Sequence, residues 1–378
     1  GQRLGMPVDV FLRDYWQKRP LLIRAAFPGF ELPLQPDDLG GLACEDGALS
    51  RLIEHDRARD QWTVHHGPLD EDLFARLPDR DWTVLVQDVD KWDADVARLL
   101  EDFRFLPSWR VDDVMISYAE DAGGVGAHVD QYDVFLLQGH GQRRWRIDAR
   151  PNPPTGFRDD VEIKQLREFS PSHDWLLEPG DMLYLPPGVP HDGTAVGPCM
   201  TFSVGMRAPA VNELLLDAAE YLAERLPETA RYSDPDLVAA THAGEITPVD
   251  LARVAKTLGP LADNLGHGGL VDWFGRFITR YRCAQFAAPA ESPLDAAELT
   301  QRLARGDQLW RHPWARFAWC GQADTVQLFA AGEALPCPRD LAENLCTHAA
   351  PTFGTAPTPA AAAVLVSLVN NGQLTFAA

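Results

Sequence analysis

The sequence predicts a mainly β N-terminal domain of the sandwich or barrel class, followed by an all-α region and a small C-terminal α+β domain. A chain of 378 residues has room for two or three such domains. Up to about Arg207 it is rich in Gly, Pro and Trp, and turn dipeptides separate short alternating apolar segments. After Ala208-Pro209 the apolar residues recur at helical spacing instead. We place the three domains at residues 1–207, 208–285 and 286–378.

Helices are predicted at the start of the first domain and throughout the second. Val8–Trp16 reads as an amphipathic helix, because its apolar residues fall at i, i+3, i+4 and i+7. In the second domain, Asn212–Leu226 carries an apolar stripe, and another helix extends from Leu261 or beyond to Tyr281. These helices have few local strands to cover. Packing on a second copy of the chain and packing on the β-domain are equally compatible with the pattern.

The C-terminal domain mixes helices with short strands. A helix over Leu294–Arg305 is followed by strand-like runs near Leu309, near Phe317 and over Val326–Phe329. Two further helices are predicted before an Asn371-Gly372 turn, over Pro338–His348 and Pro359–Val369. This arrangement is compatible with a winged-helix module.

Composition and charge limit the functions available to the chain. Its hydrophobic (46%) and charged (24%) fractions are those of soluble globular proteins. The net charge of −21 disfavours nucleic acid and favours a basic partner. Six scattered cysteines without a C-x-x-C pair are expected of reduced thiols. The longest apolar run, Ala360–Val369, is shorter than the roughly 20 residues of a membrane span. We therefore expect a cytoplasmic protein without membrane contact.

A candidate metal site combines two distant segments. His128 and Asp130 are two residues apart, so on a strand both point to one face. A Pro-rich turn that follows Glu178-Pro179-Gly180-Asp181 delivers His191. Two histidines and one carboxylate are the facial triad of non-haem Fe(II). The Gly-rich approach to His128 and the P-G-D-x-L-Y-L-P-P-G-x-P-H stretch are characteristic of a double-stranded β-helix, or jelly roll, of the cupin type.

The other histidines are predicted to be surface or packing residues, because none has a paired carboxylate in a comparable strand context. They are His55, His65, His66, His140, His173, His242, His267, His312 and His348.

Between the two ligand segments, Arg143 shares a strand face with Trp145 and Ile147 and is expected to point into the domain. A buried guanidinium needs an anion, and its planar fork matches a carboxylate. A dicarboxylic acid that chelates iron at one end could supply that anion at the other, which suggests 2-oxoglutarate. The alternative is a structural ion pair with an Asp or Glu.

Strand alternation also predicts a substrate pocket. Asp113, Met115 and Ser117 share one strand face, and Thr201 shares a face with Ser203. Tyr132 follows Asp130 by two residues, so it is expected on the same face as His128 and Asp130. An acid, a thioether, an aromatic ring and a hydroxyl would suit a guanidinium or ammonium side chain. The alternative is ordinary strand alternation, with Asp113 as a carboxylate at a loop edge.

The sequence resembles the bacterial ribosomal oxygenases, which are JmjC-type hydroxylases that use Fe(II), 2-oxoglutarate and O₂ to modify an arginine of large-subunit ribosomal protein sixteen. The resemblance extends over nearly the whole chain. It is carried by Y-W-Q-K-R-P from Tyr15, H-V-D-Q-Y-D-V-F from His128, the stretches Glu178–Gly193 and Ser203–Pro209, and Y-S-D-P-D from Tyr232.

This resemblance implies a role for each candidate residue. Iron would be bound by His128, Asp130 and His191, and the co-substrate carboxylate by Arg143. The substrate arginine would contact Asp113, Met115, Tyr132 and Ser203. Thr201 stands where close relatives have an Asn near the co-substrate, and it can donate one hydrogen bond but not two. The architecture implied is a JmjC domain, a helical dimerisation region that makes a homodimer, and a winged helix.

Three other functions are compatible with the residues. One is oxidation of a different protein side chain, such as histidine or lysine, including methyl-lysine demethylation. A second is a regulator that couples a cupin sensor to a DNA-binding winged helix, which the acidity of the chain disfavours. A third is a metal-free cupin scaffold, which the complete triad disfavours.

Overall fold

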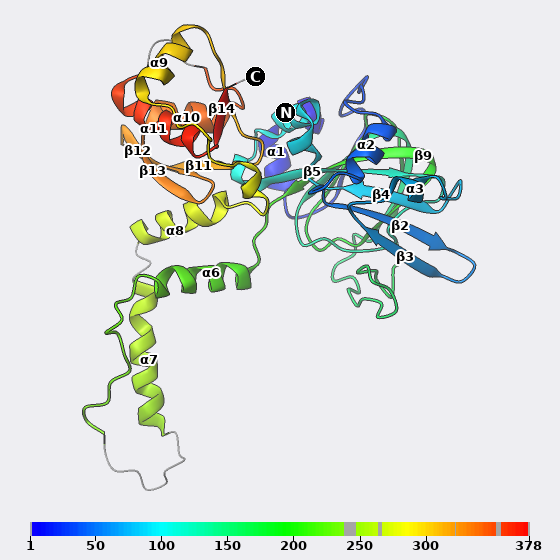
Figure 1. The fold of residues 1–378 in the computed structure, drawn as a ribbon. Coiled ribbons are helices and arrows are strands. Elements are labelled where there is room, and N and C mark those ends of the chain that lie inside the picture. The colour runs from blue at the N-terminus through cyan, green and yellow to red at the C-terminus, as the bar shows by residue number, and fades with distance from the viewer. Residues whose placement is uncertain (1, 238–246, 264–266, 322, 353–356, 377–378) are drawn as a thin grey trace. The chain divides into compact units, whose positions relative to one another are not determined.

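The computed structural model of the chain consists of two compact units, residues 1–208 and 209–378, which are described separately (Figure 1). It describes residues 2–237, 247–263, 267–321, 323–352 and 357–376. The first unit ends within one residue of the predicted β-domain. The further division of the second unit at residue 285 stays a prediction.

A nine-stranded antiparallel sheet forms the first unit, in the order β1-β8-β6-β9-β5-β4-β2-β3, with β7 paired to β6. Its two longest strands, β6 and β9, pair from Val134 opposite Gly205 to Ile147 opposite His191. Strand β5 lies on the other side of β9. The strands are β1 (Leu21–Ile23), β2 (Ser50–Asp56), β3 (Gln61–His66), β4 (Trp82–Val86), β5 (Val111–Ala119), β6 (Val134–Ile147), β7 (His173–Leu177), β8 (Met182–Leu185) and β9 (His191–Met206).

The main core of this unit lies between the sheet and the N-terminal helix α1 (Val8–Asp14). Phe11 of α1 is fully buried, with its ring centroid 5.0 Å from that of Tyr184 and 5.8 Å from that of Phe135. The predicted N-terminal helix is confirmed, although it ends at Asp14 rather than Trp16. The remaining helices are short: η1 (Gln2–Leu4), α2 (Pro36–Ala43), α3 (Glu71–Phe74), α4 (Val89–Trp92), α5 (Ala94–Arg98), η2 (Leu99–Phe103) and η3 (Ser108–Arg110).

A buried carboxylate, Asp133, fixes the start of β6 close to the candidate site. It is completely buried and accepts hydrogen bonds from the Tyr184 hydroxyl (2.6 Å), the Gln17 amide (2.9 Å) and the Arg110 guanidinium (3.2 Å). Since a buried carboxylate is costly unless its oxygens are satisfied, this network specifies one position for the chain beside Tyr132.

The second unit contains a group of helices and two small sheets. Strands β11, β12 and β13 form one sheet, and β10 pairs with β14 in the other. Helices α9, α10 and α11 cover a core that includes the fully buried Leu299, Leu328 and Leu345. The elements are α6 (Val211–Ala223), α7 (Pro248–Asp263), α8 (His267–Thr279), η4 (Ala284–Phe286), α9 (Ala296–Ala304), β10 (Leu309–Arg311), β11 (Phe317–Cys320), β12 (Thr325–Ala330), β13 (Glu333–Pro338), α10 (Arg339–Thr347), α11 (Pro359–Asn370) and β14 (Leu374–Phe376).

Most predicted elements of this unit are confirmed, but strands β13 and β14 were not predicted. Of the helix expected to run from Leu261 or beyond to Tyr281, the structure has the end of α7 at Asp263 and α8 from His267 to Thr279, and residues 264–266 lie outside the described residues. Strand β13 was missed because it contains Pro336 and ends at Pro338, and prolines lower the strand signal. They are tolerated there because β13 is an edge strand.

Helix α6 presents a polar face to α8 and leaves an apolar face exposed. Asp217 accepts hydrogen bonds from Trp273 (2.8 Å) and Arg280 (2.6 Å), and the Tyr221 hydroxyl donates to Asp272 (2.7 Å). On other positions of α6, the exposed fractions of Val211, Leu215 and Leu216 are 72%, 65% and 71%. Within the described part of the chain, no helix is both long enough and apolar enough to cross a bilayer.

Candidate metal centre

The three predicted metal ligands come together in the first unit. The histidine nitrogens and carboxylate oxygens that His128, Asp130 and His191 offer all lie within 4.8 Å of one another. Among the described residues, no other group of three or more histidines, cysteines and acids is so arranged. The oxygen Oδ2 of Asp130 lies 4.0 Å from Nε2 of His128 and 3.6 Å from Nε2 of His191. The three residues predicted from the sequence to bind a metal therefore do lie together in the structure.

The local backbone differs from the prediction, which put His128 and Asp130 on one strand. Neither residue is in a regular strand, because the segment before β6 forms only an isolated bridge. In that bridge the backbone N–H groups of His128 and His191 each donate to the other's carbonyl, at 2.9 Å. The Asp130 carbonyl accepts a further bond from Gly188 (2.8 Å). Pairing with the turn before β9, rather than strand alternation, brings the ligands together.

Both histidines are oriented by hydrogen bonds to backbone carbonyls. Nδ1 of His128 donates to the Gly126 carbonyl and Nδ1 of His191 donates to the Val189 carbonyl, both at 2.9 Å. Because a carbonyl only accepts, each Nδ1 carries a proton, and Nε2 is the nitrogen that presents a lone pair in the neutral ring. Burial, assisted by the neighbouring His128, lowers the pKa of His191 to about 4, so it is neutral at pH 7. Neutral imidazoles fixed in this way are the form that binds metals.

The guanidinium of Arg143 is buried without a carboxylate partner. Its side chain on β6 is 5% exposed, and its Nη1 donates to Ser117 Oγ at 3.3 Å. Its Nε and Nη2 atoms are buried and have no hydrogen-bond partner in the structure. No described Asp or Glu lies within ion-pair distance, so the structural ion pair considered as an alternative is absent from the described residues. The arrangement is that of an anion site.

This anion site lies close to the metal ligands. Cζ of Arg143 is 5.9 Å from the ring centroid of Trp145, and that ring is 5.8 Å from the ring of His191. The indole N–H of Trp145 is also buried without a partner. Arg143 and His191 therefore lie beside the same indole ring.

Most residues predicted to contact substrate and co-substrate lie on the neighbouring strands β5, β9 and β6, whereas Tyr132 precedes β6. Met115 is opposite Ser203 and Ser117 is opposite Thr201 in the β5–β9 pairing. The hydroxyl of Thr201 is buried and donates to Oε1 of Gln138 on β6, at 3.1 Å. Because its proton is committed to Gln138, contact of Thr201 with a co-substrate stays a prediction.

Asp113 is the most perturbed acid of this group. It is 9% exposed, and its Oδ2 accepts the backbone N–H of Asp88 at 3.1 Å. Burial raises the pKa of Asp113 to about 7, with further contributions from Asp112, Asp88 and Asp90. Burial also raises the pKa of Tyr132, and the next contributions come from Asp130 and Asp113. The Tyr132 hydroxyl, on a side chain that is 42% exposed, thus lies within the electrostatic influence of both Asp130 and Asp113.

Three of the histidines predicted to be surface or packing residues pair with carboxylates. His55 lies 3.1 Å from Asp60, His65 lies 2.9 Å from Glu54, and His66 pairs with Glu162. The partners come from the opposite strand of the β2–β3 hairpin, its turn, and a distant loop, so sequence spacing did not reveal them. Each is a two-residue pair and not a metal cluster.

Two family models match the chain, one in each unit. The JmjC domain matches residues 98–214, and the ROXA-like winged helix matches residues 269–375. The uL16 3-hydroxylase of Escherichia coli is 37% identical over 378 residues, covering 97% of this chain and 96% of the relative. The chain belongs to the bacterial ribosomal oxygenase family. The predicted JmjC domain and winged helix are thereby confirmed.

Other relatives of this ribosomal oxygenase support the same family assignment. A probable ribosomal oxygenase of Haemophilus influenzae is 36% identical over 257 residues, which are 68% of this chain and 60% of the relative. A crystal structure of YcfD from E. coli superposes with a TM-score of 0.85 at 36% identity, covering 99% of both chains. The structure of the same protein in complex with cobalt and 2-oxoglutarate gives a TM-score of 0.83 at 35% identity and equal coverage.

Proposed function

We propose that this ribosomal oxygenase uses Fe(II), 2-oxoglutarate and O₂ to hydroxylate the β-carbon of an arginine in the large-subunit ribosomal protein uL16. One observation carries the proposal: a His/Asp/His donor set lies close to a buried arginine with two unpartnered N–H groups. The E. coli relative supports it, since that protein is a uL16 3-hydroxylase and position 3 of an amino acid is the β-carbon.

The metal would be held by Nε2 of His128, Nε2 of His191 and a carboxylate oxygen of Asp130. Two neutral imidazoles and one carboxylate suit Fe(II), and three protein ligands leave positions for co-substrate and O₂. When bound, the iron supplies the oxidising chemistry that inserts one oxygen atom of O₂ into a C–H bond while 2-oxoglutarate becomes succinate and CO₂. The protein residues bind and orient the reactants.

Arg143 would bind the distal carboxylate of 2-oxoglutarate. Its Nε and Nη2 atoms are the unpaired donors that such a carboxylate would satisfy, while Nη1 keeps its bond to Ser117. Burial beside Trp145 strengthens this charge-assisted pairing, because water does not compete for it. The same contact would fix the orientation of the co-substrate, with its 2-oxo acid end directed toward His191 and the other ligands.

The substrate arginine would be held by Asp113, Met115, Tyr132 and Ser203. A guanidinium entering this pocket would favour the ionised form of Asp113, and the Tyr132 ring offers a face for cation–π contact. The Met115 thioether and the Ser203 hydroxyl, which are opposite each other, complete the wall. These contacts would place the β-carbon near the metal ligands, since Tyr132 is near Asp130.

The exposed apolar face of α6 supports a homodimer. Leu215 and Leu216 are more than half exposed although both are large and apolar. Faces of this kind are normally covered by a partner. Because the polar face of α6 is already occupied by α8, we assign the apolar face to a second copy of the chain. A basic ribosomal substrate also fits the net charge of −21 and a cytoplasmic location.

The experiment that tests this function measures succinate formed by the purified protein with Fe(II) and 2-oxoglutarate. The ribosomal protein uL16 is added in one reaction and other ribosomal proteins, or histidine- and lysine-containing peptides, in the rest. The proposal predicts that uL16 stimulates turnover and that His128→Ala abolishes the stimulation. Stimulation by a histidine or lysine peptide alone would favour a different target residue. Salt-dependent binding to duplex DNA without turnover would favour a regulator.

A further inference from the structure

The glycine-rich segment before His128 has no regular secondary structure, although it carries a metal ligand. Residues 122–127 read Ala-Gly-Gly-Val-Gly-Ala and are mostly unstructured. Gly126 has a φ of +78°, a conformation that other residues rarely adopt. Such a segment needs outside contacts to hold the ligand in one orientation. The backbone bonds between His128 and His191 supply some of these contacts, and the rest come from the loop between β6 and β7.

Three successive carbonyls of this segment have distinct partners. The Gly126 carbonyl accepts the Nδ1–H of His128 at 2.9 Å, which sets the plane of the imidazole. The carbonyl before it, on Val125, accepts the side-chain amide of Gln165 at 3.0 Å. The carbonyl after it, on Ala127, accepts the backbone N–H of Leu166 at 2.8 Å. The peptide group that orients the metal ligand is therefore held on both sides by neighbouring residues of one loop.

Gln165 is built into this position. It is only 4% exposed, and a Cβ added to Gly126 would lie 2.5 Å from its Nε2. Only a glycine lets the two groups approach so closely. On its other side, Oε1 of Gln165 is 3.5 Å from Nη1 of Arg158, and that guanidinium pairs with Asp60 in the β2–β3 turn at 3.0 Å.

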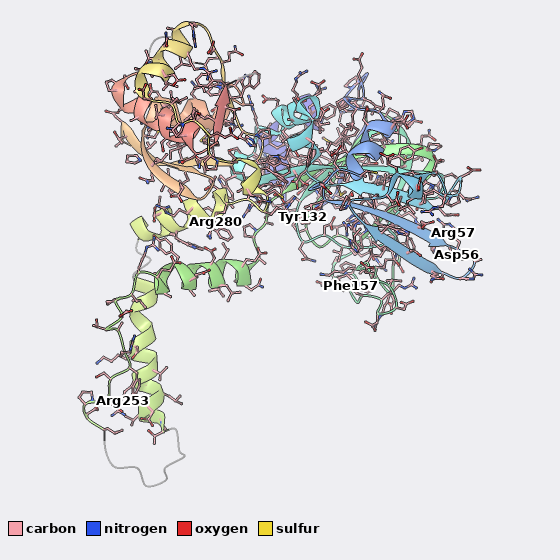
Figure 2. All side chains as sticks on the ribbon, viewed as in Figure 1. Asp56, Arg57, Tyr132, Phe157, Arg253 and Arg280 are labelled. Atoms are coloured by element: carbon pink, nitrogen blue, oxygen red, sulfur yellow. The ribbon has the colours of Figure 1, made fainter. Side chains whose placement is uncertain are left out.

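The loop that carries Gln165 connects β6 to β7 and is attached to the β2–β3 hairpin. Besides Arg158 with Asp60, it contributes Glu162, which pairs with His66. Phe157 marks a point within this loop in Figure 2, and Asp56 and Arg57 mark the end of β2. Because the loop is anchored at both the hairpin and the glycine-rich segment, it can hold Gln165 in a fixed place.

From this geometry we infer that Gln165 is a positioning residue for the metal ligand His128. Its amide fixes the Val125 carbonyl, the fixed 125–127 segment presents the Gly126 carbonyl, and that carbonyl orients the imidazole so that Nε2 faces Asp130. This inference rests on the proposed metal centre. Loss of a group that orients a metal ligand typically weakens metal binding by roughly 10-fold to 100-fold.

The test measures Co(II) binding to the metal-free protein by the visible absorption of the ion, with no dependence on hydroxylation. Gln165→Met keeps the length of the side chain and removes the donor. Gln165→Glu keeps an acceptor for Arg158 but cannot donate to Val125 when ionised. Gln142→Met is the matched control, because the Gln142 amide donates to Glu178 on the surface at 3.0 Å.

Both Gln165 variants are expected to bind Co(II) roughly 10-fold to 100-fold more weakly than the wild-type protein. At saturating Co(II) their ligand-field bands should be altered. Their Tm without metal should fall below that of Gln142→Met because Gln165 is buried, but a loss of stability alone would leave the bands unchanged. Affinities and spectra equal to those of the control would overturn the role of Gln165. Failure of the wild-type protein itself to bind Co(II) would instead contradict the metal centre.

Discussion

Replacing Asp113 with Asn should stabilise the protein and impair it as an enzyme at the same time. The carboxyl group of Asp113 is nearly buried, and three further acids, Asp88, Asp90 and Asp112, raise its pKa after burial. Asn keeps the shape of the side chain and an oxygen to accept the Asp88 N–H. It removes the charge that we assign to recognition of the substrate guanidinium. A residue kept for function at a cost in stability behaves in this way.

The size of the effect follows from the pKa of Asp113, which folding raises from 3.8 to about 7. The unfolded chain therefore loses this proton first, and folding becomes less favourable as pH rises from 3.8 to 7. The full cost is reached above pH 7. A shift of roughly 3 units at 1.36 kcal/mol per unit gives a cost of at most about 4 kcal/mol at pH 8. At pH 5, which is only about 1 unit above the pKa of 3.8 in the unfolded chain, the ionisation of Asp113 reduces stability by about 2 kcal/mol.

Urea denaturation of wild-type protein and Asp113→Asn at pH 5 and pH 8 measures this difference. Asp113→Asn should be more stable than the wild-type protein at both pH values, and the difference in the free energy of unfolding should grow with pH. Asp159→Asn is the control, because the Asp159 side chain is 86% exposed. In the wild-type protein the KM for uL16 should fall between pH 6 and pH 8 as Asp113 ionises, and in the variant it should be high and flat. An advantage that is absent, or that shrinks as pH rises, would refute the reasoning.

Three other predictions address the remaining parts of the account. Arg143→Met should raise the KM for 2-oxoglutarate by at least about 10-fold, since a buried charge-assisted pair is lost. Arg144→Met is the control and should leave this KM unchanged, because Arg144 is half-exposed and pairs with Asp174. His191→Ala should abolish Co(II) binding, as judged by visible absorption, while the exposed His140→Ala should leave it intact. Replacing both Leu215 and Leu216 with Asp should convert a dimer to a monomer, as measured by light scattering. Val196→Asp on β9 is the control and should leave the dimer intact. If the wild-type protein is itself a monomer, the proposed interface does not exist.

The sequence predicted the elements whose signals are local. The helices α1, α6 and α9 follow from side-chain periodicity, as do the shared strand faces of Arg143 with Trp145 on β6 and of Thr201 with Ser203 on β9. The three candidate metal ligands could be assigned because H-x-D follows a Gly-rich segment and occurs together with the P-G-D-x-L-Y-L-P-P-G-x-P-H stretch. Their strand setting was wrong, since the glycines before His128 keep the segment irregular and a bridge to His191 replaces strand alternation.

What the sequence did not predict depends on contacts between distant segments. Asp88 and Asp90 raise the pKa of Asp113 from helix α4, more than twenty residues away, and no spacing rule connects them. The bond from Thr201 to Gln138 depends on the register between β6 and β9. Gln165 lies in a loop without any motif, and only its position against Gly126 marks it as significant.

The most direct test of the proposed function follows the oxygen atom into the substrate. Purified protein is incubated with Fe(II), 2-oxoglutarate, uL16 and isotopically labelled ¹⁸O₂, and the uL16 peptides are fragmented in a mass spectrometer. The account predicts one labelled oxygen on the β-carbon of a single arginine, absent when Asp130 is replaced by Ala. No mass gain on uL16, or an oxygen derived from water instead of O₂, would contradict it.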